Sequence, residues 1–250
     1  MGAKKDPTDH RDLKHRVRYA AAIPPLLPAA ARVRYSPPIK QQGYRKSCTG
    51  HAVAWFWEQV LHSRMGRTLT LSPAFPWYYA RKEEGVEKED EGVSMRSIMD
   101  AIHDHGVCPN EMWDTSMPVD AEPPSMARTY GQALKLPRYE RCDDLDTIRY
   151  AIAKEDQSVC IGVPVFANWY NNPRVSRTGV IPMPGDSEEM GGHAMVICGY
   201  DDRKQILTVA NSWGTQFGDH GFVYLPYQFL EQYWFDGWTV GFDAIPDQRV

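Results

Sequence analysis

The chain has 250 residues, 42% of them hydrophobic, and carries a net charge of -4 at pH 7. This length suits one large domain or two halves that share an interface, with enough apolar residues for a sizeable core. The nearly balanced charge argues against nucleic-acid binding and against a polybasic membrane anchor. We therefore expect neither nucleic acid nor a membrane among the partners of this chain.

Residues 1–39 are basic at first and then rich in proline, with little periodicity. We interpret them as an extended arm that lies on the body of the protein. No uninterrupted apolar core follows the charged start, and prolines interrupt the apolar segment 20–31. The sequence therefore predicts neither a signal peptide nor a membrane span in this region.

A polar loop leads from Gln42 to Cys48, and a strongly apolar segment follows up to Leu61. Apolar residues recur there at three- and four-residue spacing and also fill the other faces, which predicts a buried helix. Cys48 would lie in its first turn, where unpaired backbone N–H groups and the helix dipole stabilise a thiolate. Alone this signal is weak, because a free cysteine is usually a small buried hydrophobic residue.

Two further helices are predicted later in the chain. Ser94 caps the first, in which four apolar residues up to Ile102 share one face. The two histidines near its end lie two residues apart, so they do not face one metal ion. Asp143 or Asp144 opens the second helix.

From residue 159 onward the sequence changes to short β-like runs. We predict strands at 159–165, 192–200, 206–210 and 221–225. Because helices dominate the first half and strands the second, the fold class is α+β. Within a single catalytic domain we separate the arm from a helical lobe, 40–128, and a β-rich lobe, 129–250. The active site is expected between the two lobes.

The cysteines give no sign of a disulfide framework or of a cysteine zinc site. Their number is odd and no two have C-x-x-C spacing. The five are Cys48, Cys108, Cys142, Cys160 and Cys198. Such a set suits a reducing compartment, and we expect no metal.

Two local sequences in the strand-rich half supply what a catalytic cysteine would need. In the first, His193 follows Gly191 and Gly192 and enters a strand with its backbone open to close approach. In the second, Asn211 and Trp213 lie where a strand gives way to a glycine loop. Each feature alone is usually structural, the second often being a simple turn.

Together with the cysteine loop, these sequences resemble the papain family of cysteine peptidases, in its propeptide-less bacterial type. The family has a glutamine six residues before the nucleophile, as Gln42 is before Cys48. It has a strand-borne His-Ala pair, as at His193, and an Asn-Ser-Trp-Gly block, as from Asn211. The order of these four residues and the cysteine-to-histidine spacing also match the family.

The sequence departs from the family at three points. Arg45 stands where the family has a disulfide cysteine, and Thr49 stands where it has a tryptophan after the nucleophile. No long inhibitory proregion precedes the catalytic part. These differences argue against secretion and against zymogen control, and they leave the chemistry intact.

The resemblance implies a papain-like two-lobed fold, with the nucleophile helix in the helical lobe and the histidine and asparagine in an antiparallel, β-barrel-like lobe. Cys48 would be the nucleophile, held as a thiolate by the imidazolium of His193. Asn211 would orient that imidazole, and Trp213 would shield their hydrogen bond from water. Gln42 would form the oxyanion hole with the backbone N–H of Cys48.

By the same resemblance, Gly92 and Val93 would pair with an extended peptide as an added strand, with Gly192 beside it. The expected function is a cysteine endopeptidase that cleaves a protein or peptide through a thioester on Cys48, without a cofactor. An amidase, deamidase or acyltransferase using the same residues stays open as an alternative. A catalytically inactive peptide-binding module is the second alternative.

A cytoplasmic peptidase without a proregion would be exposed to the proteins around it. Narrow specificity, a separate inhibitor, or delivery into another cell would each resolve this. We therefore keep the hypothesis of a bacterial effector or toxin whose cognate immunity protein covers Cys48 and His193. It would act in the cytoplasm or reach another cell by a route independent of a signal peptide.

Overall fold

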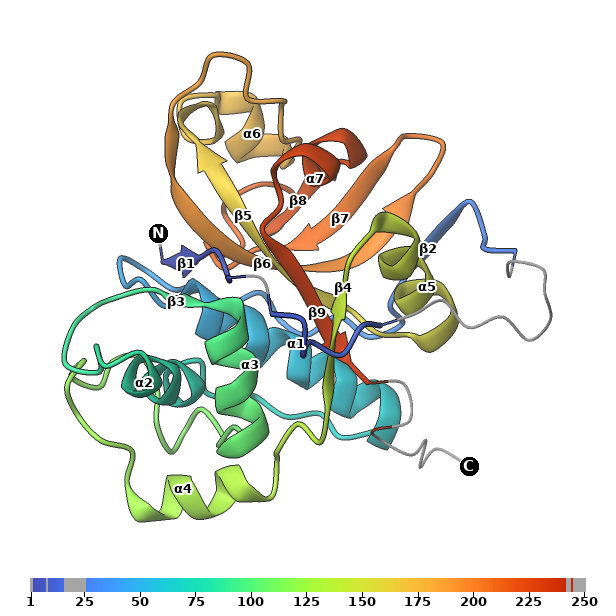
Figure 1. Cartoon of the computed structure of the whole chain (residues 1–250). Coiled ribbons are helices and arrows are strands. Elements are labelled where there is room, and N and C mark those ends of the chain that lie inside the picture. Colours follow the sequence, from blue (N-terminus) through green and yellow to red (C-terminus); the bar gives the residue numbers. More distant parts are fainter. Residues whose placement is uncertain (1, 8, 16–25, 242–243, 245–250) are drawn as a thin grey trace.

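The computed structural model describes residues 2–7, 9–15, 26–241 and 244. In Figure 1 the helices α1 to α4 lie together below a curved sheet, and the start of the chain runs between the two groups. Residues 20–25 of the apolar segment 20–31 lie outside the described residues. Among the described residues, no helix is both long and apolar enough to cross a membrane.

The predicted cysteine helix is confirmed as α1, Cys48–Met65. Almost every residue of its first four turns is buried, as the apolar residues on all its faces predict. It ends at Gly66, whose left-handed backbone (φ 64°) lets its N–H bond back to the carbonyl oxygen of His62.

The other helices of the lower group follow directly along the chain. They are α2, Ala74–Glu83; α3, Met95–Asp104; and α4, Ser125–Gln132. The predicted cap of α3 is confirmed, because Ser94 accepts a hydrogen bond from the backbone N–H of Ser97. Its predicted apolar face is also buried.

The helix predicted near residue 144 is α5, Leu145–Glu155, and Asp144 caps it by accepting from the N–H of Thr147. Three short helices connect the later strands. They are η1, Ala167–Trp169; α6, Pro173–Thr178; and α7, Tyr227–Tyr233.

A seven-stranded sheet forms the upper part, and all its strand pairs are antiparallel. The strands that were predicted are β5, Val159–Phe166; β6, Glu189–Asp201; β7, Ile206–Ala210; and β8, Phe222–Pro226. The additional strands are β2, Ala30–Arg32; β4, Tyr139–Cys142; and β9, Asp236–Val240.

The strand order is β4-β9-β5-β6-β7-β8, with β2 also paired to β6. Within the described residues β4 and β8 are edges that do not pair with each other, so the barrel-like lobe is an open sheet. The sequence analysis missed β4 and β9. The first is short and has two adjacent charged residues, Glu140 and Arg141, and the second begins with Asp236-Gly237, a pair typical of turns.

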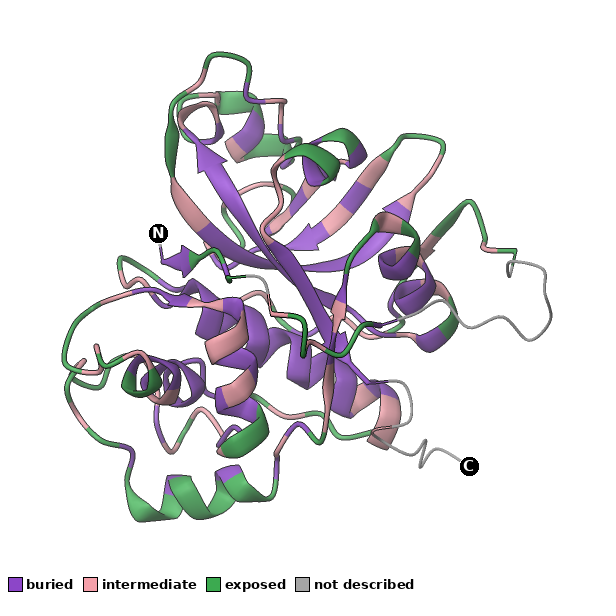
Figure 2. Cartoon of the chain, viewed as in Figure 1, coloured by how far each residue is buried: buried purple, intermediate pink, exposed green. Residues whose placement is uncertain are grey.

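The largest core cluster joins the two parts of the molecule. It contains Phe56 and Trp57 of α1 together with Val196 of β6 and Trp238 of β9. Figure 2 shows α1, β5 and β9 buried over most of their lengths. The lobe boundaries 40–128 and 129–250 stay a prediction, but the two parts share one core.

The N-terminal arm lies on this body and enters its interior. The short strand β1, Ala3–Lys4, pairs in parallel with β3, Val93–Ser94. Ala3, Asp6 and His15 are buried, where a surface arm was expected. Figure 1 shows β1 running between β3 and β6.

The buried amide of Gln59 links α1 to the sheet. Its Oε1 accepts from the N–H and the hydroxyl of Ser158 at 3.0 and 2.8 Å, and its Nε2 donates to the carbonyl oxygen of Asp156 at 2.9 Å. We expect Gln59→Ala to lower the free energy of unfolding by about 3 kcal/mol, because these partners lose their bonds while buried. Urea denaturation measures the change. Gln132→Ala, at an exposed position, is the control. Equally small effects of the two substitutions on the free energy of unfolding would contradict the role of Gln59 as a link between α1 and the sheet.

Candidate active site

Cys48 begins α1 with a fully buried thiol. Burial raises its pKa, and hydrogen bonds from the backbone of Ala194, Gly2 and Thr49 oppose that rise. The first-turn position is therefore as predicted, but the pKa in this structure is raised rather than lowered. Desolvation of the charged form outweighs the hydrogen bonds of the helix start.

His193 lies on β6 beside this thiol, since the N–H that contacts the sulfur belongs to its neighbour Ala194. The His193 Nε2 is 2.8 Å from the Asn211 Oδ1, and its Nδ1 has no hydrogen-bond partner in the structure. The ring is fully buried, which lowers its pKa to about 4 although the bond to Asn211 opposes this. One imidazole nitrogen is thus oriented by an amide while the other is left for proton transfer.

The pairing of β6 with β7 brings Asn211 to His193, because Val196 and Ala210 are directly opposite each other in the two strands. Trp213 stacks on the imidazole with ring centroids 4.8 Å apart and an angle of 29° between the planes. It also contacts a group of aromatic rings at the end of the sheet, namely Trp169, Tyr170 and Phe217. Trp213, the residue predicted to shield the hydrogen bond between His193 and Asn211, therefore contacts the imidazole of this pair.

Gln42 is held between the cysteine loop and the asparagine loop. Its Oε1 accepts from the Ser212 hydroxyl at 2.6 Å, and its Nε2 donates to the carbonyl oxygen of Arg45 at 3.0 Å. Its backbone N–H donates to the carbonyl oxygen of Ser212 at 2.9 Å. The side chain is buried and fixed, and one amide hydrogen remains for an oxyanion.

The arm covers the proposed substrate surface, which we define as Gly92, Val93 and Gly192. Ala3 pairs with Val93. A Cβ added to Gly92 would overlap the carbonyl of Gly2, and a Cβ added to Gly192 would overlap the carbonyl oxygen of Ala3. Backbone of the arm thus lies against all three residues.

No local pattern predicts this placement. Residues 2–7 have neither periodicity nor a β-like run, so local preference does not predict their strand. Their only relevant feature is small size at Gly2 and Ala3, which permits the close approach to Gly92 and Gly192.

The covered site is electrically neutral at its centre. With the thiol pKa raised and the imidazole pKa near 4, neither Cys48 nor His193 is charged at pH 7. Burial therefore disfavours the thiolate–imidazolium pair that nucleophilic attack requires. Among the described residues, no cluster of acidic, histidine and cysteine side chains suits a metal ion, and the five cysteines are free and buried.

Comparison with known proteins gives a consistent result. A family model described as papain family cysteine protease matches residues 32–231. A curated relative, an uncharacterized peptidase C1-like protein of Acanthamoeba polyphaga mimivirus, is 29% identical over 201 residues. That match covers 76% of this chain and spans only 64% of the length of the relative.

Among solved structures, xylellain, a cysteine protease from Xylella fastidiosa, superposes with a TM-score of 0.86 at 26% identity. The match covers 96% of this chain and 94% of xylellain. Procathepsin B S9 from Trypanosoma congolense shares the fold at 14% identity, with a TM-score of 0.71 over 97% of this chain and 86% of that one.

Because the arm covers the site, we expect it to limit the access of reagents to Cys48. In Gly92→Ala the added methyl group would overlap the backbone of Gly2. The three atoms nearest to this methyl group all belong to Gly2. The arm should then be displaced, and alkylation of Cys48 by iodoacetamide at pH 7 should be about tenfold faster or more, since even 1.4 kcal/mol of clash gives that factor.

Peptide mapping measures labelling of each cysteine, and the four other buried thiols serve as controls in the same sample. An unchanged rate at Cys48 would show that the arm does not limit access to it. Faster labelling of all five cysteines would indicate general loosening of the fold instead.

Proposed function

The chain belongs to the papain family of cysteine proteases, and from this premise we propose that it is a cysteine endopeptidase that hydrolyses peptide bonds through a thioester on Cys48. The observation that carries the proposal is the 2.8 Å contact of His193 with Asn211 beside a cysteine at a helix start. Trp213 stacked on that imidazole supports it.

Opening of the site comes first in the proposed mechanism. When the arm leaves, water reaches Cys48 and His193, and the burial that keeps both neutral is relieved. The proton can then pass from sulfur to the His193 Nδ1, which has no other partner. The resulting thiolate attacks the carbonyl carbon of the peptide.

Each later step uses a group already in position. His193 protonates the leaving amine and afterwards takes a proton from the water that hydrolyses the thioester. Asn211 keeps the Nε2 side of the ring occupied, so the reactive nitrogen faces the cysteine. The remaining amide hydrogen of Gln42 and the N–H of Cys48 would stabilise the oxyanion.

Three other activities use the same residues up to the thioester. An amidase, deamidase or acyltransferase would differ only in the group that leaves or accepts the acyl chain. Mass spectrometry of products separates these activities, because a peptidase yields two shorter chains whereas the others shift the mass of an intact one. An inactive peptide-binding module would yield no change in mass at all.

The bacterial effector hypothesis, with an immunity protein as partner, rested on the apparent exposure of the site. The arm over Gly92 and Gly192 supplies a cover from within the chain, which removes that reason for a separate inhibitor. Growth of bacteria that express the wild type or Cys48→Ala tests the hypothesis. Arrest by the wild type alone supports it, and equal growth together with cleavage by the purified protein contradicts it.

The decisive test of the endopeptidase is a comparison of wild type with Cys48→Ala on a mixture of unfolded proteins. New N-termini should form with the wild type and be absent with the variant, because only the thiol can form the acyl-enzyme. Chelators should not change the result. New N-termini in both samples, or in neither, would contradict the proposal.

Gln42→Ala tests the oxyanion hole. We expect kcat to fall by about 10²–10³ with little change in KM, because the amide meets negative charge only in the transition state. Steady-state hydrolysis of a fluorogenic peptide measures both constants. A large rise in KM at constant kcat would instead indicate a role in binding substrate.

His193→Ala and Asn211→Ala should differ in size of effect. Loss of the proton-transferring group should lower kcat/KM by about 10²–10⁴. Loss of Asn211, which only orients the ring, should cost at least about tenfold less. The same fluorogenic assay decides, and equal losses would mean that the asparagine does more than orient.

A further inference from the structure

The first unusual contact of the arm is between two carboxyl groups. Asp6 meets Asp236 of β9, and both side chains are buried. Burial, together with the charge and the hydrogen bond of Asp6, raises the pKa of Asp236 to about 8. Two carboxyl groups in contact away from water hold one proton between them, because both cannot be ionised there without repulsion.

This contact lies next to the proposed substrate surface. A Cβ at Gly162 would be 3.4 Å from both the Asp236 Oδ1 and the Met95 Cγ, and Met95 directly follows β3. Asp6 also accepts from the backbone N–H of Arg96 at 3.0 Å, in the first turn of α3. The carboxyl pair therefore anchors the arm immediately after the strand that covers Val93.

The second unusual contact is at His15, the last described residue before position 26. The buried His15 has its Nδ1 2.7 Å from Glu140 of β4 and its Nε2 2.9 Å from Glu155 of α5. Burial opposes protonation of this imidazole, but the two carboxylates outweigh it and raise its pKa to about 9. The ring is hydrogen-bonded to Glu140, whereas Glu155 lies at ion-pair distance without hydrogen-bond geometry. Only the protonated ring carries the charge that pairs with two buried carboxylates, so this anchor also requires a proton.

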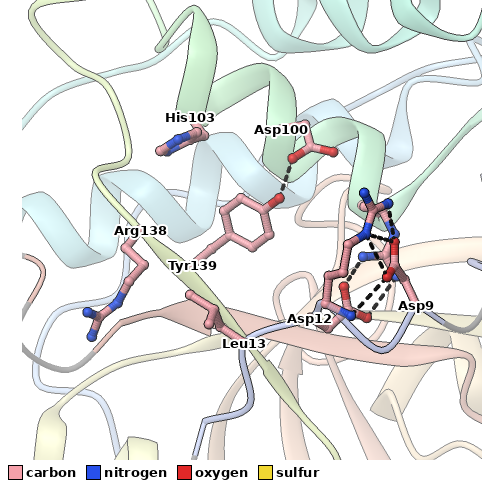
Figure 3. A pocket seen from close by; sticks show the side chains of 9 residues that line it. Asp9, Asp12, Leu13, Asp100, His103, Arg138 and Tyr139 are labelled. Atoms are coloured by element: carbon pink, nitrogen blue, oxygen red, sulfur yellow. Dashed lines mark hydrogen bonds and ion pairs between the residues drawn. The ribbon is translucent and has the colours of Figure 1, made fainter.

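Between these anchors the arm borders a pocket of about 500 Å³, which Asp9, Asp12 and Leu13 help to line. Figure 3 shows Asp9 and Asp12 turned toward arginine side chains, while Tyr139 bonds to Asp100 elsewhere in the lining. The arm residues Asp9 and Asp12 bond to arginines, and ion pairs of this kind do not change between pH 6 and 9.

We propose that residues 2–7 and 9–15 form a cover over the proposed substrate surface that is held in place by protons, and that this cover detaches as the pH rises. The cover is a part of the chain itself, and both of its buried anchors are lost by deprotonation. This inference rests on the proposed function only for the role of the surface that becomes free.

Other charged groups near the two anchors do not reverse the direction of the expected pH dependence. Asp236 faces Asp6 from the arm and Arg141 from β4, and the arginine only partly offsets the repulsion. Near His15, Arg138 lies 3.0 Å from the second oxygen of Glu140, which neutralises part of that carboxylate. Glu155 has no such cation in the described contacts, so His15 is its partner.

The dependence of docking on pH follows from the pKa values of the anchor groups in the docked and the detached arm. Detachment exposes Asp236 and removes Asp6, so its pKa returns toward 3.8, while His15 returns toward 6.5. Docking therefore takes up a proton at the carboxyl pair below pH 8 and another at His15 between pH 6.5 and 9. Both anchors stabilise the docked arm at lower pH and lose this contribution as pH rises.

The expected size of the effect follows from the number of protons. The equilibrium constant for opening should rise about hundredfold per pH unit between 6.5 and 8, and about tenfold per unit from 8 to 9. Over the whole range this amounts to about 10⁴-fold. A cover held only by ion pairs and backbone hydrogen bonds would show no such dependence.

Backbone hydrogen exchange in Cys48→Ala measures opening without any need for activity. Three amides report directly on the arm. The N–H of Arg96 is held by Asp6, that of His15 by the carbonyl of Arg141 at 2.8 Å, and that of Arg141 by the carbonyl of Leu13 at 2.7 Å. Their protection factors, corrected for intrinsic exchange, should fall with pH as stated, while amides within α1 keep theirs.

Asp6→Asn and His15→Gln identify the groups responsible. An asparagine donates to ionised Asp236 at any pH, so the dependence between pH 6.5 and 8 should weaken to about tenfold per unit. His15→Gln should have the same effect there and remove the dependence above pH 8. Asp9→Asn and His10→Gln, on the same arm but outside these anchors, should keep the hundredfold slope.

Protection that is flat from pH 6.5 to 9 in the wild type, or a slope unchanged by both Asp6→Asn and His15→Gln, would overturn the proposal. Failure of the proposed function looks different. In that case the wild type cleaves nothing at any pH, while the protection factors still fall with the expected slope and the cover stands confirmed.

Discussion

The first turn of α1 packs against β6, and the rest of the site depends on this contact. It places the thiol of Cys48 against the N–H of Ala194, next to His193. The helix can lie so deep because it is apolar on nearly every face. The same burial removes water from the thiol and the imidazole, so both are neutral in the covered state.

Desolvation explains how the side chains can be in position while their charged forms are disfavoured. A preformed pair of His193 and Asn211 needs no rearrangement for catalysis, and Gln42 is fixed by Ser212. The arm backbone lies against Gly92, Val93 and Gly192 and leaves no space for a substrate on that surface.

The arm is held by contacts that would be unfavourable in most protein interiors. A buried pair of acids and a histidine between two acids cost stability unless they carry protons. Such contacts make the docking energy depend on pH, whereas apolar packing would not. Their location on the arm, at Asp6 and His15, concentrates this dependence in the segment that must move.

The sequence by itself determined the elements with strong local patterns. Apolar periodicity located α1, capping residues located the start of α3 and α5, and β-like runs located four strands. The open sheet was not predicted in full, because β4 and β9 gain their stability from neighbours rather than from their own residues. Motif order also brought Cys48, His193 and Asn211 together as candidates before any geometry was known.

Only the tertiary structure decided the state of the site. Whether the thiol pKa is raised or lowered depends on burial and on backbone hydrogen bonds from segments far away in the chain, at Gly2 and Ala194. The partners Asp6 and Asp236 are likewise far apart in sequence, and nothing local in either marks the contact. Long-range burial and charge are properties of the folded chain as a whole, so local patterns do not carry them.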